Sequence, residues 1–253
     1  MEITGINNQT VKEVVKLQQK KYRNETGKFL LEGVKSIEEA LDYGIEFDKI
    51  FVLSEKGGKY GGKYKFPENI LIETNSAVLK KISTTDTPPD VVGVAYQPKN
   101  NFDKLKTSKR VILLENISDA GNLGTIIRSA VAFNMDSIVL YGETIDLYNP
   151  KCVRSSVGNL WKTNIVSLKT VKELNNYFSD FERVATLPKT ESSVMFKDWT
   201  PSEKVLMMFG SEADGLSEDL KKYATKNLTI EMSEKVESLN LSVSASLVMY
   251  KMM

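Results

Sequence analysis

The chain has 253 residues, 41% of them hydrophobic, and a net charge of +1, so a packed core in one large domain or two ordinary ones is expected. It contains no histidine and one cysteine, Cys152, which excludes a Ser-His-Asp triad, a Cys-His dyad, an intramolecular disulfide and a zinc site. Carboxylates could still hold magnesium, but no metal is expected. The N-terminus has no apolar signal segment and no apolar run reaches the ~18 residues of a membrane span, which favours a cytoplasmic protein.

Two stretches are locally basic although the whole chain is not. Residues 11–35 carry seven cations against three anions, and residues 99–110 carry five cations against one anion. Such patches attract phosphates, but a solvated helix face and a solvated linker have the same composition. Charge alone favours the solvated surfaces.

The first part of the chain is predicted to be a small α/β unit. Helical spacing of apolar residues predicts an amphipathic helix over 11–24, and a second helix is expected over 35–43. Strands are predicted over three short apolar runs: 29–32, 49–53 and 91–96. The polar stretch from Gln97 to Ser108 is the candidate linker, which places domains at 1–98 and 109–253 with a linker at 99–108.

Beyond this stretch the alternation of strands and helices begins again. Strands are predicted over 111–115, 137–141, a run ending at 166, 205–209 and 228–230. Helices are predicted over 123–133, 150–158, 171–181, 218–224 and 241–252. The apolar strand runs indicate a parallel sheet that is covered on both faces.

One glycine-rich segment imitates a phosphate-binding loop. The run from Gly57 to Lys63 fits the spacing G-x-x-x-x-G-K, but Tyr64 stands where the motif needs serine or threonine for magnesium. Pro67 then prevents a helix from starting cleanly. The segment is interpreted as a basic loop, and nucleotide hydrolysis is rejected.

A polar loop and a helix follow the strand at 111–115. The segment is Asn116-Ile-Ser-Asp119-Ala-Gly-Asn122-Leu-Gly124-Thr-Ile-Ile-Arg128, in which Asn122 is a good N-cap. Arg128 lies one turn beyond Gly124, and helical side chains slant toward the N-terminus, so its guanidinium is expected over Gly124. A surface arginine on a well-capped helix would have the same pattern.

Two further segments follow strands near the C-terminus. Phe209-Gly210-Ser-Glu212-Ala-Asp214-Gly215-Leu216 brackets acidic residues with glycines at the carboxyl end of a strand, where open α/β sheets bind ligands. The second comprises Ile230-Glu-Met232 and Val236-Glu-Ser238-Leu239-Asn240-Leu-Ser242-Val-Ser244-Ala245, which opens a helix of small residues. A tight turn and a closely packed helix would also account for these patterns.

Together these segments resemble the three motifs of the SpoU/TrmH-type RNA ribose 2′-O-methyltransferases of the SPOUT superfamily, in order, spacing and flanking strands. The resemblance runs from about residue 10 to the end. It implies an α/β fold: a C-terminal parallel-sheet SPOUT domain with a trefoil knot, preceded by a small α/β domain. The segments 20–33 and 83–89 are similar to the ribosomal-protein-L-thirty-like substrate domain of some members.

The resemblance also implies an activity and its residues. The protein would transfer a methyl group from S-adenosyl-L-methionine to a ribose 2′-oxygen of structured RNA. Ribosomal RNA of the 23S type is favoured, because members with the N-terminal domain often modify ribosomal RNA. The implied catalytic residues are Arg128, Asn122, Glu212, Ser238 and Asn240; cofactor-binding residues are Gly210, Ile230, Met232 and Leu239; RNA-binding residues are Lys20, Lys21 and Arg23. A homodimer through the C-terminal domain is expected.

Some alternatives stay open at this point. Arg128 would act either as a general base or by holding a phosphate and stabilising alkoxide charge. Ala120 and Glu231 stand where the family usually has proline, although neither change removes a proposed functional side chain. The alternative functions are a transfer-RNA ribose methyltransferase and a non-catalytic RNA-binding protein that retains the fold. A Rossmann-type methyltransferase would need a glycine-rich loop after the first strand, and residues 28–33 offer none.

Overall fold

The computed structural model describes residues 1–54 and 66–253, so the glycine-rich run at 57–63 lies outside the described residues. The chain forms two compact units. The N-terminal unit comprises Met1–Pro98 together with Asp146–Trp161, and the C-terminal unit comprises Lys99–Ile145 together with Lys162–Met253. A segment from the second half of the sequence therefore belongs to the first unit.

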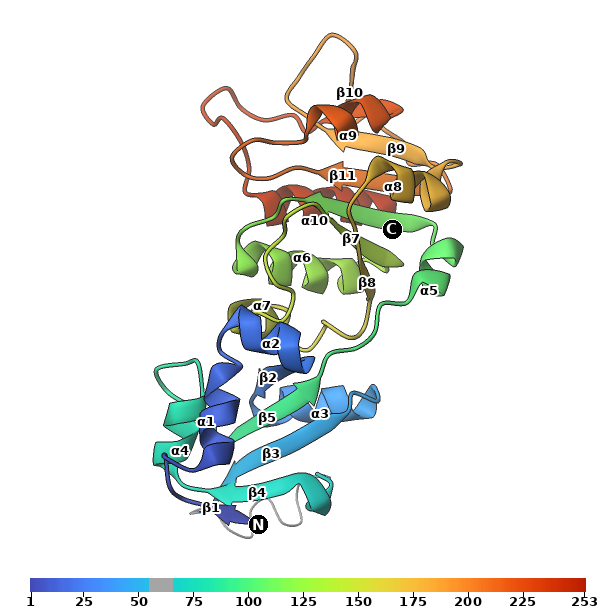
Figure 1. Cartoon of the computed structure of the whole chain (residues 1–253). Helices are drawn as coiled ribbons and strands as arrows, with labels where there is room; N and C mark the ends of the chain where they lie inside the picture. The colour runs from blue at the N-terminus through green and yellow to red at the C-terminus, as the bar shows by residue number, and fades with distance from the viewer. Residues whose placement is uncertain (55–65) are drawn as a thin grey trace. The chain divides into compact units, whose positions relative to one another are not determined.

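The N-terminal unit is built on a mixed sheet of order β1-β4-β3-β5-β2 (Figure 1). Its strands are β1 (Glu2–Ile3), β2 (Lys28–Glu32), β3 (Phe47–Leu53), β4 (Leu71–Thr74) and β5 (Val91–Tyr96). Its helical elements are α1 (Gln9–Lys16), α2 (Lys20–Thr26), α3 (Val34–Asp42), the short 3-10 helix η2 (Glu68–Ile70), α4 (Ser76–Ile82) and α7 (Pro150–Ser155). One core cluster packs Val11, Val14 and Leu17 from the α1 region against Leu30, Phe51 and α4 residues such as Leu79.

The single helix expected over 11–24 is two helices. α1 ends at Lys16, with Leu17 as its C-cap, and α2 begins at Lys20. The Leu17 carbonyl accepts a 2.8 Å hydrogen bond from the Arg23 guanidinium. Leu17 is buried in the core. The hydrogen bond from Arg23 and the burial of Leu17 together fix a turn between the two helices. The helical spacing of apolar residues does not reveal this turn.

Arg23 is buried in the N-terminal unit, with 2% of its surface exposed. Its Nη2 lies 2.5 Å from Oδ2 of Asp146, and its Nε donates to the same oxygen at 2.7 Å. Nearby, the rings of Phe29 and Tyr148 lie with centroids 4.9 Å apart. Burial raises the pKa of the Tyr148 phenol, and the charge of Asp146 adds to the effect. These contacts attach residues 146–148 to the N-terminal unit.

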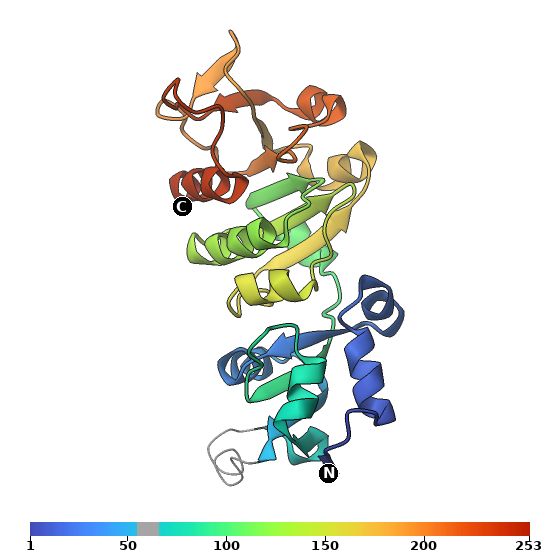
Figure 2. The ribbon, with the colours of Figure 1, turned by 90° about the vertical axis from the view of Figure 1, so that its left-hand side faces the viewer.

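The C-terminal unit is a parallel sheet of order β10-β12-β9-β11-β6-β7-β8, which confirms the predicted parallel sheet (Figures 1 and 2). Its strands are β6 (Arg110–Glu115), β7 (Ser137–Tyr141), β8 (Asn164–Leu168), β9 (Glu182–Thr186), β10 (Ser193–Met195), β11 (Val205–Phe209) and β12 (Lys226–Thr229). Its helices are α5 (Phe102–Thr107), α6 (Ala120–Ala132), α8 (Val171–Phe178), α9 (Glu218–Tyr223) and α10 (Leu241–Met252).

Helices cover both faces of this sheet. Val111 and Leu113 of β6 pack in a core cluster with α8 and α9 residues such as Leu174 and Leu220. Ile112 and Leu114 alternate with them and are also fully buried, so they face the other side. There α6 and α10 pack together, and the hydroxyls of Ser129 and Ser246 lie 2.8 Å apart. Within the stretch expected as a linker, residues 102–107 form α5, whose Leu105 is buried in this core.

Among the described residues, no helix combines the length and the apolar character needed to cross a membrane.

Replacing Arg23 with alanine leaves the Asp146 carboxylate buried without its cation. We expect this to destabilise the N-terminal unit by about 3–5 kcal/mol. The free energy of unfolding of this unit can be measured in urea by monitoring Trp161 fluorescence in a Trp199→Phe variant. Trp161 belongs to the N-terminal unit and Trp199 does not, so the signal reports on this unit. The control is Lys21→Ala, whose partner Glu25 is 3.9 Å away and exposed, and which should cost less than about 1 kcal/mol. Equal effects of the two substitutions would contradict the structural role of Arg23.

Candidate functional site

The candidate site lies at the carboxyl ends of four neighbouring strands of the C-terminal unit. β12, β9, β11 and β6 are adjacent in the sheet and parallel, so the loops that follow them emerge at the same edge. This is the edge at which open α/β sheets bind ligands. All three motif segments of the sequence begin there: at residue 116 after β6, at residue 210 after β11 and at residue 230 after β12.

The loop after β6 is shaped by backbone conformation and by a helix cap. Asn116 has a φ of 50°, and its Oδ1 accepts a 2.8 Å hydrogen bond from the backbone of Glu143. The N-cap of α6 is Asp119, whose Oδ1 accepts from the Asn122 backbone at 2.7 Å. The prediction that Asn122 is the N-cap is wrong. Asn122 lies in the first turn of α6, and its side chain is therefore available for other contacts.

The three segments are joined by a chain of side-chain hydrogen bonds. Nδ2 of Asn122 donates to Oε1 of Glu212 at 2.7 Å. Oδ1 of Asn122 accepts from Nδ2 of Asn240 at 3.0 Å. Oδ1 of Asn240 in turn accepts from the backbone and the hydroxyl of Ser242, at 2.9 and 2.6 Å. Each amide thus donates in one direction and accepts from the other, which fixes the orientation of both.

The loop after β11 turns sharply at Gly210. A Cβ at this position would lie 1.9 Å from the carbonyl carbon of Gly215, so no side chain fits. Ser211 and Gly215 pair through two backbone hydrogen bonds of 3.2 and 3.1 Å. The end of the loop is anchored to β6, because the Ser217 backbone donates a 2.7 Å hydrogen bond to the buried carboxylate of Glu115. Burial raises the pKa of the neighbouring Tyr141 phenol, and the charge of Glu115 adds to the effect.

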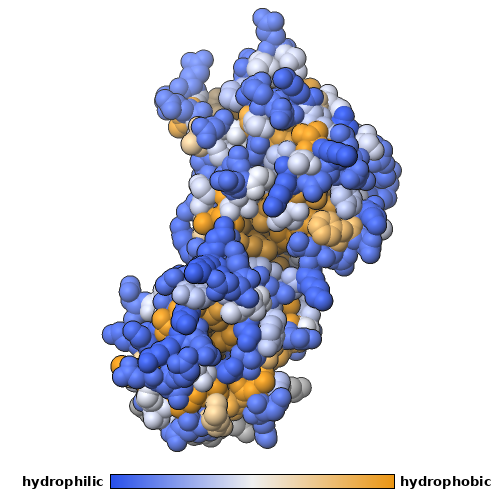
Figure 3. Space-filling view, viewed as in Figure 1, coloured by the Kyte–Doolittle hydropathy of each residue, from blue (hydrophilic) through white to orange (hydrophobic). Residues whose placement is uncertain are grey.

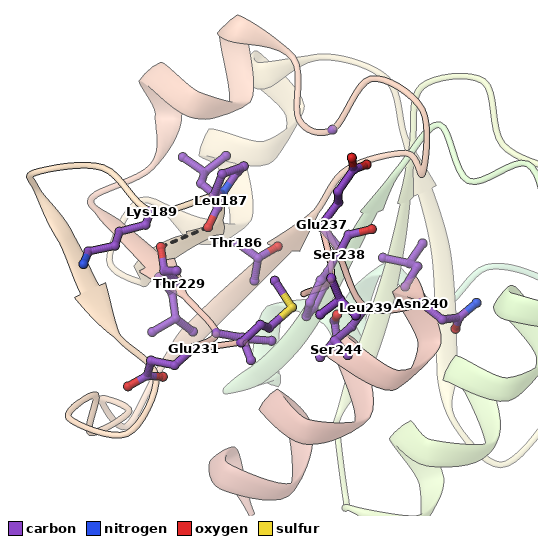
Figure 4. Close-up of a pocket in the computed structure, with 18 of the residues that line it drawn as sticks. Thr186, Leu187, Lys189, Thr229, Glu231, Glu237, Ser238, Leu239, Asn240 and Ser244 are labelled. Atoms are coloured by element: carbon purple, nitrogen blue, oxygen red, sulfur yellow. Dashed lines mark hydrogen bonds between the residues drawn. The ribbon is translucent and has the colours of Figure 1, made fainter. Parts of the chain in front are cut away.

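A cavity of about 680 Å³ opens at this edge of the sheet (Figure 4). It is bounded by the ends of β9, β11 and β12 and by the segment that leads into α10. All four predicted cofactor residues line it, and so do three of the predicted catalytic residues: Gly210, Ile230, Met232, Leu239, Glu212, Ser238 and Asn240. The residues that the sequence analysis did not propose include Thr186, Leu187, Lys189 and Ser244.

The composition of this cavity suits S-adenosyl-L-methionine. Leu228, Ile230 and Leu239 offer apolar surface for an adenosyl group. The tight turn between Gly210 and Gly215 forms part of the cavity wall, and only glycine fits at position 210. Glu212, Glu231 and Glu237 also line the cavity, and their charges favour a cationic sulfonium over an anionic ligand.

Arg128 and the predicted RNA-binding residues lie outside this cavity. The side chain of Arg128 is exposed on α6 and forms no hydrogen bond or ion pair with any described residue, so its guanidinium is available to a substrate. Lys20 and Lys21 are exposed at the start of α2 in the N-terminal unit. Arg23 is not exposed with them; its guanidinium is used by Asp146 and Leu17, which corrects its assignment as an RNA contact.

Two glycine positions allow a matched test of the loop after β11. Gly210→Ala should lower the affinity for S-adenosyl-L-methionine by tenfold or more, to order of magnitude, since its Cβ would overlap backbone atoms of Gly215 and Leu216. Gly215→Ala should have the smaller effect, because its Cβ meets nothing within 4 Å and only the φ of 67° opposes it. Titration calorimetry of both folded variants measures the difference, and a larger loss at Gly215 would refute the role given to Gly210.

Comparisons with known proteins agree with this geometry. Residues 109–250 match the model of the SpoU rRNA Methylase family, and residues 8–93 match that of the MRM3-like substrate binding domain. The chain is 28% identical to the 23S rRNA (guanosine(2553)-2′-O)-methyltransferase RlmP of Bacillus subtilis, over 98% of each chain. It is 25% identical to a 23S rRNA (uridine(2479)-2′-O)-methyltransferase of Streptomyces viridochromogenes, over 90% of this chain and 83% of that one.

A solved structure gives the same result for the fold. The S-adenosyl-L-methionine-bound rRNA methyltransferase of Sinorhizobium meliloti superposes with a TM-score of 0.87 at 28% identity, covering 99% of this chain and 96% of that one. The family match covers more than half of the chain, including the loops that meet at Asn122. The chain belongs to the SpoU rRNA methylase family, and its C-terminal unit has the SPOUT methyltransferase fold.

Proposed function

We propose that this protein transfers a methyl group from S-adenosyl-L-methionine to a ribose 2′-oxygen of 23S-type ribosomal RNA. The observation that carries the proposal is the hydrogen-bonded chain from Glu212 through Asn122 to Asn240, which lies at the edge of a cavity suited to the cofactor. The relatives named above, which span nearly the whole chain, are 2′-O-methyltransferases of 23S rRNA and support this substrate.

The cofactor supplies an electrophilic methyl group on a sulfonium. The residues of this chain must align a ribose hydroxyl with that methyl and help to remove the hydroxyl proton. Glu212 and Asn240 line the cavity and are joined through Asn122, so the amides of Asn122 and Asn240 have fixed orientations beside the place where the ribose must enter. Ser238 also lines the cavity, and in this proposal it contacts the same ribose.

Arg128 acts on the substrate side. A guanidinium keeps its proton at neutral pH, so it serves poorly as a general base. Its fork of donors suits a phosphate oxygen and the charge that develops on the 2′-oxygen. Arg128 is exposed and unpaired among the described residues, so no internal partner competes for these donors.

Arg128→Ala should reduce methyl transfer about a hundredfold or more, because a group that stabilises transition-state charge is removed. Cofactor affinity should stay nearly unchanged, since Arg128 does not line the cavity. Arg128→Lys should not restore activity, because an ammonium lacks the planar fork. Tritiated methyl incorporation into ribosomal RNA, run beside a cofactor titration, measures both quantities. If the alanine variant keeps most of its turnover, or loses cofactor binding as severely as activity, this role is wrong.

The functions of the domains are part of the same proposal. Residues 1–98 form the RNA substrate-binding domain, with a ribosomal-protein-L-thirty-like fold, and residues 109–253 form the methyltransferase domain. Two segments depart from these bounds: Asp146–Trp161 pack within the N-terminal unit, and α5, in the stretch 99–108, packs within the C-terminal unit. The match of residues 8–93 to a substrate-binding domain supports the first assignment. Lys20 and Lys21 contact RNA, whereas Arg23 holds the surrounding structure. The trefoil knot of the family and a cytoplasmic location also belong to this proposal.

The protein assembles as a homodimer through α10. The exposed face of this helix carries an apolar stripe at helical spacing: Val243, Leu247 and Tyr250, which are 47%, 41% and 66% exposed. Phe133, at the end of α6, extends the stripe, since its ring lies edge-on to that of Tyr250 with centroids 5.7 Å apart. An apolar stripe on an otherwise packed helix suits the self-complementary contact of a two-fold dimer.

Tyr250→Glu should convert the protein to a monomer, because it buries a charge in the proposed contact. Tyr43→Glu is the matched control: Tyr43 is also an exposed tyrosine, 58% exposed, but lies at the end of α3 in the N-terminal unit. Sedimentation velocity at micromolar concentration should show a dimer for the unaltered chain and for the control, and a monomer for Tyr250→Glu. A monomeric unaltered chain would overturn the proposed assembly.

A further inference from the structure

The C-terminal ends of α1 and α4 lie side by side in the N-terminal unit and are joined by Gln18. The Gln18 amide donates to the carbonyls of Lys81, Ile82 and Ser83 at 3.4, 3.2 and 3.1 Å, and so caps the end of α4. This contact joins the turn between α1 and α2 to the end of α4, and cationic and aromatic residues lie on all three helices. We call them the helix-end surface: Lys16, Lys20, Lys21, Tyr22, Lys80 and Lys81.

The lysines of the helix-end surface are exposed and almost unpaired. Lys21 lies 3.9 Å from Glu25, with both side chains more than half exposed. None of the other lysines of the surface forms an ion pair with a described residue. Figure 3 shows a predominantly hydrophilic surface over this part of the unit. Clustered cations without internal partners leave a local positive potential that attracts phosphates.

Helix dipoles explain only some of these lysines. Lys16, Lys80 and Lys81 lie in the last turns of α1 and α4, where a positive charge is favourable. Lys20 and Lys21 are instead the first two residues of α2, where a positive charge opposes the dipole, and the first turn of α2 has no acidic residue. Local helix stability therefore does not account for the whole cluster.

Tyr22 adds an aromatic ring beside two of these lysines. The ammonium groups of Lys16 and Lys21 lie 5.4 and 5.7 Å from its ring centroid. A nucleotide whose phosphate binds either ammonium would have its base close to this ring. Tyrosine rings stack on unpaired bases of RNA, whereas the bases of a duplex are not available for such stacking.

Contacts of Arg23 and Gln18 fix the helices that carry the helix-end surface. The buried Arg23 guanidinium bonds to the Leu17 carbonyl and to Asp146, which fixes the turn between α1 and α2. Gln18, in that same turn, fixes α4. Because these contacts are made within the unit, little ordering of the backbone is needed when a ligand binds.

We infer that the helix-end surface binds RNA at an unpaired nucleotide, with the lysines on the phosphates and Tyr22 stacked on the base. The inference rests on the proposed RNA substrate, and it names how the N-terminal unit recognises that substrate. It adds α4 and Tyr22 to the proposed RNA contacts. The pattern of charges along the sequence does not point to either of them.

The test measures binding of the full chain to protein-free 23S ribosomal RNA as a function of salt. Lys80→Ala/Lys81→Ala should weaken binding and lower the slope of log affinity against log salt by about 0.7 for each phosphate that the variant no longer neutralises. The matched control is Lys221→Ala/Lys222→Ala, which removes the same charge from the last turn of α9 in the C-terminal unit. An equal decrease in affinity for the two pairs would overturn the inference, because it would show a response to net charge alone.

The stacking of Tyr22 has a separate signature. Tyr22→Ala should lower affinity roughly tenfold with no change in the salt slope, and Tyr22→Phe should restore it, because stacking does not need the hydroxyl. A fully paired RNA duplex of about 20 base pairs, long enough to present successive grooves, should compete poorly with the 23S RNA. Unchanged binding by Tyr22→Ala, or equal competition by the duplex, would contradict recognition of an unpaired base.

Cofactor titration and methyl incorporation at saturating RNA separate this inference from the proposed function. If the surface binds RNA but the protein transfers no methyl group, the proposed function fails and the RNA surface stands. If methyl transfer to 23S RNA is normal and the Lys80/Lys81 and Tyr22 variants bind as the unaltered chain does, the surface is wrong and the proposed function stands.

Discussion

The side-chain amide of Asn122 is the contact on which the candidate site depends. It donates to Glu212 after β11 and accepts from Asn240 before α10, so one residue joins three loops that are distant in sequence. Its position is fixed in turn by Asp119, which caps α6, and by the packing of α6 on α10. Removal of the amide at this position would leave Glu212 and Asn240 without their shared partner, although every strand of the sheet would remain. The site is therefore more sensitive to this side chain than the fold is.

The sheet supplies the geometry that these side chains need. Strands β12, β9, β11 and β6 are parallel neighbours, so their following loops meet at one edge without any long insertion. Gly210 allows the tight turn after β11, because a side chain there would overlap the backbone of Gly215 and Leu216, and the buried Glu115 anchors the far end of the same loop through Ser217. In the function proposed here the cofactor side of the site depends on backbone shape, whereas the substrate side depends on the amides of Asn122 and Asn240 and on the exposed Arg128.

Much of this arrangement could be predicted from the sequence, and the exceptions have physical causes. Apolar strand runs and the polar residues that end them located β6, β11 and their loops. The strand β9 was missed because it begins with the charged residues Glu182 and Arg183, and only Val184 and Ala185 in it are fully buried. So short an apolar run does not predict a strand. Thr186, at its end, lines the cavity, so this omission also hid part of the site. Arg23 was assigned to the surface because its buried partner, Asp146, lies more than a hundred positions away in the sequence, and no local pattern reveals such a pair.

We propose that the oriented amides of Asn122 and Asn240, beside a cofactor cavity, direct methyl transfer to a ribose oxygen of ribosomal RNA. The most direct measurement is nucleoside mass spectrometry and alkaline-hydrolysis mapping of 23S RNA from a strain lacking the protein. We expect that one 2′-O-methylated nucleotide is missing, and that the unaltered chain restores it while an Asn122→Ala variant at equal abundance does not. An unchanged set of 2′-O-methyl marks in the deletion strain, or full restoration by Asn122→Ala, would contradict the proposed methyl transfer directed by these amides.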